Sequence, residues 1–166
     1  MQSLLIISLF IIAISSLISL FADSREGNDE RVECDGYRKI EIKKTCGKNG
    51  YLIHYGLPNC QQFSRAVEKG LFDEKGAEWV KCTTECLIDK LFEIHQSSPS
   101  LSCSSLEEKA FNTHVPCYLE CHFCEVCRSQ KWGLIFTYRF RDFLNLNSIS
   151  QVYDVISECG LFHCFT

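Results

Sequence analysis

Twelve cysteines among 166 residues constrain the fold of this chain more than any other feature of the sequence. Four of them lie in the stretch CYLECHFCEVC at positions 117–127. On an α-helix, at about 100° per residue, Cys117, Cys121 and Cys124 share one face, and Cys127 lies at its edge. The apolar side chains of the stretch cluster on the opposite face. We therefore expect a buried central helix, with Pro116 in its first turn.

The first 33 residues are predicted to lie outside the fold. Residues 4–21 form an uncharged apolar run, and Ala22 supplies a small residue at a plausible signal-peptidase site, so residues 1–22 are interpreted as a signal peptide. The run is also long enough to span a bilayer and no positive charge precedes it, so an uncleaved anchor is the alternative. Residues 23–33 predict a flexible charged leader, and residues 34–166 a single disulfide-rich helical domain.

The number of cysteines also indicates the cellular compartment in which the protein works. An export signal and an even number of cysteines are typical of an oxidising environment and allow up to six disulfides, so we expect a secreted, extracellular protein. The formal net charge is −4, with acidic and basic residues interspersed. That pattern gives no reason to expect a nucleic acid as partner.

Apolar residues recurring at helical spacing predict an all-α fold, a compact disulfide-rich bundle of about five helices. The first begins at Pro58, and the second follows Asp73 as N-cap and runs to the Ser97-Ser98-Pro99 break. The stretch at 117–127 supplies the fourth.

Two capping-box spacings predict the starts of the third and the last helix. They are Ser105 with Glu108, and Ser148 with Gln151. The last helix is expected to end at Gly160.

Two segments have weaker patterns. Residues 34–56 indicate an irregular loop region with Cys34 and Cys46, in which residues 37–42 alternate like one small strand. Residues 132–143 fit a strand or a helix nearly equally well. Their aromatic residues alternate with Lys131, Arg139 and Arg141, a mixture found in receptor-binding hot spots and membrane-facing strips, although core packing is the favoured interpretation.

The cysteine spacing predicts two particular bridges. If the second helix and the 117–127 helix are antiparallel, residues at the same height have a constant sum of residue numbers. Cys86 with Cys117 and Cys82 with Cys121 have the same sum. We therefore expect these two disulfides, one helical turn apart.

Residues 60–160 resemble the stanniocalcins, a family of secreted, disulfide-rich helical hormones. The likeness is a skeleton of cysteines and aromatic residues. The matching positions are Cys60 to Phe63, Phe72, Asp73, Gly76, Trp79 to Lys81, Cys86, Leu87, Cys103, Cys117, Tyr118, Cys124 and Cys159.

The resemblance implies a compact helical core with bridges Cys86 to Cys117 and Cys124 to Cys159. It also implies that Cys60 and Cys103 bond back to the N-terminal loop, where Cys34 and Cys46 are the partners. Cys82, Cys121, Cys127 and Cys164 have no counterpart in the family skeleton. A late cysteine of the family links two chains, so Cys164 is expected either to form a homodimer or to close on Cys127.

The function expected from these features is that of a secreted, non-enzymatic, hormone-like regulatory protein that binds an extracellular protein, such as a receptor or a protease-like target. No catalytic residue, metal or cofactor is expected. The spacing of Cys117, Cys121 and Cys124 would also suit an iron–sulfur or zinc site, but export favours disulfides over thiolates. The alternatives are a saposin-like lipid binder and, less favoured, a thiol-disulfide oxidoreductase that uses the CxxC pairs.

Overall fold

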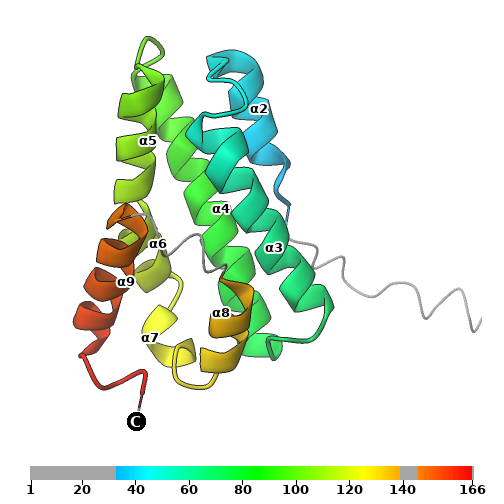
Figure 1. Ribbon diagram of the computed structural model, residues 1–166, viewed down its shortest axis with the longest axis vertical. Coiled ribbons are helices and arrows are strands. Elements are labelled where there is room, and N and C mark those ends of the chain that lie inside the picture. The colour runs from blue at the N-terminus through cyan, green and yellow to red at the C-terminus, as the bar shows by residue number, and fades with distance from the viewer. Residues whose placement is uncertain (1–32, 139–145, 166) are drawn as a thin grey trace, which may run out of the picture. The chain divides into compact units, whose positions relative to one another are not determined.

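The computed structural model describes residues 33–138 and 146–165, and these residues belong to one compact unit (Figure 1). They contain no strand, so the predicted all-α, disulfide-rich fold is confirmed, although the helices outnumber the five or so expected. The predicted signal peptide and nearly all of the predicted leader lie outside the described residues. In order, the elements are α2 (Asp35–Lys44), the π-helical segment η1 (Leu52–Gly56), α3 (Leu57–Glu68), α4 (Glu74–Ser97), α5 (Cys103–Asn112), α6 (His114–Glu120), α7 (Phe123–Val126), α8 (Lys131–Thr137) and α9 (Leu146–Cys159).

Helix α4 is the element against which most others pack, since α2, α3, α5, α6 and α7 all contact it (Figure 1). Asp73 caps its first turn as predicted, because the carboxylate accepts a hydrogen bond from the Gly76 amide at 2.9 Å. Trp79, Val80 and Leu91 are buried along its length. Among the described helices, none is long and apolar enough to cross a membrane.

The N-terminal region is helical, so the predicted loop with a small strand is wrong. Tyr37 and Ile40, three residues apart, are both buried, and Gly36 lets α2 approach Ile88 of α4 closely. The apolar residues therefore follow the helical period, with most of the charged residues between them facing solvent. After α2 the chain turns at Thr45, whose φ is 53°.

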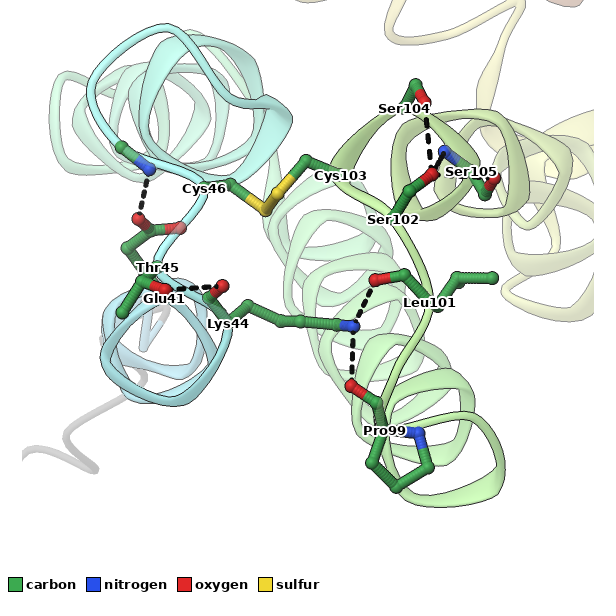
Figure 2. Close-up of a disulfide and its surroundings, with 11 residues drawn as sticks. Glu41, Lys44, Thr45, Cys46, Pro99, Leu101, Ser102, Cys103, Ser104 and Ser105 are labelled. Carbon is green, nitrogen blue, oxygen red and sulfur yellow. Dashed lines mark hydrogen bonds between the residues drawn. A yellow bond between two sulfur atoms is a disulfide. The ribbon is translucent and has the colours of Figure 1, made fainter.

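A disulfide between Cys46 and Cys103 joins the end of α2 to the start of α5 (Figure 2). Next to it, Lys44 Nζ donates hydrogen bonds to the carbonyl oxygens of Pro99 at 2.9 Å and Leu101 at 2.6 Å. These carbonyls lie in the connection after α4. The bridge and the lysine thus fasten three helices at one end of the bundle.

The predicted central helix over 117–127 is interrupted. His122 has φ 64° and ψ 35°, a left-handed conformation that ends α6 and redirects the chain into α7. Cys117 and Cys121 therefore face α4, whereas Cys124 lies beyond the break on a different helix. Pro116 does lie in the first turn of α6.

The later segments settle two open points. Residues 131–137 are helical, which decides between strand and helix for that part, and residues 139–143 lie outside the described residues. Helix α9 begins before Ser148, so the capping-box prediction there is wrong, but it ends before Gly160, whose φ is 91°. Helix α5 is also capped earlier than predicted, by Ser102 in place of Ser105.

Ser102 and Ser105 allow a matched test of this cap. The Ser102 hydroxyl accepts a hydrogen bond from the Ser105 amide at 3.1 Å (Figure 2), so Ser102→Ala should lower the free energy of unfolding by about 1 kcal/mol. Ser105→Ala keeps that acceptor and should cost clearly less. Denaturant unfolding of both variants measures the difference, and an equal or larger loss for Ser105→Ala would contradict the assignment.

Candidate functional site

All twelve cysteines are paired, and two of the bridges join α4 to α6. They are the two that the constant sum predicts, with Cα–Cα distances of 5.8 Å for Cys82–Cys121 and 5.7 Å for Cys86–Cys117. The Cys124–Cys159 bridge that the resemblance implies is also present. The remaining pairs are Cys34–Cys60, Cys46–Cys103 and Cys127–Cys164.

Cys164 takes the internal one of its two predicted roles. It is buried and bonded to Cys127, so the structure contains no sulfur there for a link between two chains. The sulfurs at 117, 121 and 124 are likewise in disulfides. Within the described residues, no group of three or more His, Cys, Asp or Glu side chains is arranged to hold a metal ion.

A buried hydrogen-bond chain links η1, α5, α6 and α9. Tyr51 Oη lies 2.9 Å from His114 Nε2, and His114 Nδ1 lies 2.8 Å from Gln151 Oε1. The Gln151 amide nitrogen donates to the carbonyl oxygen of Phe111 at 2.8 Å, which fixes its oxygen toward His114. His114 Nδ1 must therefore carry the proton, and the Tyr51 hydroxyl donates to Nε2.

Burial keeps His114 neutral. Burial lowers the pKa of His114 to about 4, and the hydrogen bond to Gln151 opposes only part of that shift. Burial likewise raises the pKa of Tyr51 and of Tyr118 well above the usual value for a phenol. His114 and these two phenols are therefore uncharged at neutral pH. The hydrogen-bond network thus serves as a structural connection between four elements.

An aromatic cavity lies beside this network. Its volume is about 50 Å³, which is room for a few water molecules and too little for an acyl chain. Trp79 Nε1 and Thr83 Oγ1 are buried polar atoms without a hydrogen-bond partner in the described part of the chain, and both residues line the cavity. The cavity thus offers little support for a saposin-like lipid site.

The candidate functional site lies at the surface, on α8. Trp132, Ile135 and Phe136 occupy one face of this helix and are 61%, 58% and 68% exposed. The rings of Trp132 and Phe136 stack with centroids 6.0 Å apart. Leu71, in the connection from α3 to α4, is 41% exposed next to α8. We call these four residues the aromatic surface.

The opposite face of α8 is fixed to the bundle. A Cβ at Gly133 would lie 2.5 Å from the Leu71 carbonyl oxygen, so the helix backbone rests directly on that connection. At one end of α8, the buried Gln130 side chain accepts a hydrogen bond from the Asp73 amide at 3.2 Å. At the other end, Gln62 of α3 donates to the Thr137 carbonyl oxygen. The aromatic surface is therefore held in place without a partner.

A hollow of about 290 Å³ adjoins the aromatic surface between α3 and α8. Two exposed cations, Arg65 and Lys69, line it, together with Phe136 and Leu71 of the aromatic surface. We call this the cationic hollow. Its remaining lining residues are Gln62, Ala66 and Thr137.

A second exposed apolar segment follows α9. Leu161, Phe162 and Phe165 are 51%, 76% and 66% exposed. The disulfides of Cys159 and Cys164 hold this turn next to α7. Exposed apolar side chains thus also occur on the segment that is bonded to α7.

Sequence reasoning found part of this site. It singled out the aromatic and basic stretch from 132, but its favoured interpretation, core packing, is wrong for Trp132 and Phe136. It did not connect Leu71, Arg65 or Lys69 with this stretch. The spacing of those two cations, four residues apart on one helix, was the available signal.

Comparison of the chain with protein-family models, curated proteins and solved structures finds no match. The stanniocalcin resemblance accordingly stays an expectation drawn from residue spacing.

The two α4–α6 bridges should act more than additively. While one bridge is intact, the other closes only a short extra loop, made of four residues on each helix. Replacing either cysteine pair by serines should therefore lower the free energy of unfolding by about 2 kcal/mol. Removing both bridges also opens the long loop between α4 and α6, so the free energy of unfolding should fall by on the order of 6 kcal/mol. Guanidinium unfolding of the two double variants and the quadruple variant measures this, and simple additivity would contradict it.

His114 should make stability depend on pH. Because its pKa is about 4 when folded and about 6.5 when unfolded, the unfolded chain binds the extra proton between these values. Its contribution is complete above pH 6.5 and falls by about 3 kcal/mol as the pH drops to 4. Unfolding free energies of the wild type and His114→Gln across this range should differ in slope. Parallel curves would refute the assignment.

Proposed function

We propose that this chain is a secreted, non-enzymatic, hormone-like regulatory protein that binds an extracellular protein through the aromatic surface. The observation that carries the proposal is the exposure of Trp132, Ile135 and Phe136 on one face of a helix whose other face is fixed. Large apolar side chains gathered on a protein surface mark interaction sites, and aromatic residues dominate binding energy in such sites.

Rigidity supports the same proposal. The contacts of Gly133, Gln130 and Thr137 hold α8 before any partner arrives, so little conformational entropy is lost on binding. The six disulfides favour an extracellular setting, since such bridges persist in oxidising compartments.

The stanniocalcin resemblance points in the same direction. The Cys86–Cys117 and Cys124–Cys159 bridges that it implies are present in this chain, and that family consists of secreted regulators. Because Cys164 is bonded internally, any homodimer would be non-covalent at that position.

The proposal predicts that a partner is lost when the aromatic surface is made polar. A photoreactive phenylalanine analogue at the exposed position 131 should cross-link a discrete extracellular protein, and excess unlabelled wild type should compete. The variant W132S/F136S should compete at least about tenfold less well, because both side chains supply the apolar contact. Its unfolding free energy should change little, since both residues are exposed.

Ile42→Ser is the matched control for this competition. Ile42 is 77% exposed but lies on α2, away from the aromatic surface, so this variant should compete as well as the wild type. Absence of any cross-linked protein, or equal competition by W132S/F136S, would overturn the proposal.

A further inference from the structure

The cationic hollow carries positive charge although the chain as a whole is acidic, with a net charge of −4. Arg65 and Lys69 of α3 supply this charge, and none of the described residues that line the hollow is acidic. A positive surface on a negative protein favours a negatively charged partner.

Within the described part of the chain, the two cations of the hollow have no ionic partner. No carboxylate of the described residues forms an ion pair with Arg65 or Lys69, and both side chains are exposed. Glu68, their neighbour on α3, does not line the hollow. Since they lie four residues apart on one helix face, both can approach the same anion.

The hollow also has an apolar side. Phe136 and Leu71, which belong to the aromatic surface, line it next to the cations. A group entering there would meet positive charge on α3 and hydrocarbon on α8. Few groups satisfy both sides at once, and a carboxylate next to a large apolar side chain is the simplest in proteins.

We infer that the partner carries a segment in which an Asp or Glu adjoins a large apolar residue. Its carboxylate would pair with Arg65 and Lys69 in the cationic hollow while the apolar residue covers Phe136 and Leu71. The inference rests on the proposed function, because it specifies the partner of the same surface.

The shape of the site favours a protein segment over a membrane. The cations line a hollow of about 290 Å³ between α3 and α8, which has room for an acidic side chain together with its apolar neighbour. An acidic group in the hollow would contact both α3 and α8. An anionic membrane would instead require the cations to lie on a surface that many headgroups reach at once.

Two probe peptides test the inference directly. The peptide acetyl-GLEEFG-amide should bind the full protein, and its lysine counterpart acetyl-GLKKFG-amide should bind about tenfold more weakly, as expected for loss of two exposed ion pairs and gain of repulsion. Trp132 fluorescence reports occupancy, because Trp132 is exposed at the site and the other tryptophan, Trp79, is buried.

A charge swap supplies the control. In R65E/K69E the preference should reverse, with the lysine peptide binding more tightly than the acidic one. The matched variant K43E/K48E changes two exposed lysines of the N-terminal region, outside the hollow, and should keep the wild-type preference.

Three outcomes would overturn the inference. They are equal binding of the two peptides, absence of any peptide binding, and the same preference in R65E/K69E as in the wild type. Vesicles of phosphatidylcholine with phosphatidylserine form a separate arm. If the protein sediments with these vesicles only when Arg65 and Lys69 are present, and binds neither peptide, the surface is a membrane-binding site.

The proposed function can fail independently. A cross-linked partner that is lost with W132S/F136S but kept with R65E/K69E would leave the proposed function intact and refute the acidic segment. Selective peptide binding without any cross-linked protein would refute the proposed function and leave only the preference of the cationic hollow for an acidic segment.

Discussion

The two disulfides between α4 and α6 are the constraint on which the rest of this structure depends. One bridge would leave the helices free to rotate about it, but two bridges one turn apart fix both rotation and register. With α6 fixed, Tyr118 packs on Trp79 with ring centroids 5.8 Å apart. His114, at the start of the same helix, then meets Tyr51 and Gln151. The buried polar chain is thus a consequence of the register of α6.

The sequence predicted this register because it depends only on the helical period. Cys82 and Cys86, and Cys117 and Cys121, are each four residues apart, so the spacing alone sets their heights. The prediction failed where the period was interrupted, at His122, since nothing local in CHFC marks a left-handed residue. It also failed at α2, where many charged residues hid a helix that buries only one narrow face.

The sequence showed which aromatic residues gather in the stretch of the aromatic surface, but it did not show that they are exposed to solvent. A short helix with apolar residues on all sides can face the core with either side, and the sequence does not say which. The choice is made by Gly133, which allows the backbone of α8 to rest on the Leu71 carbonyl. Trp132 and Phe136 then point outward. Long-range packing of this kind leaves no periodic signal, which is why Arg65 and Lys69 could not be connected with α8 beforehand.

The six disulfides also divide the chain into two covalently closed parts. One set joins residues from Cys34 to Cys121, the other joins residues from Cys124 to Cys164, and no bridge spans the link between them. A proteolytic cut elsewhere between Cys34 and Cys164 leaves the fragments bonded. A cut beside the exposed His122 separates the half with Arg65 and Lys69 from the half with α8. The three peptide bonds between Cys121 and Cys124 thus decide whether the two sides of the cationic hollow stay covalently joined.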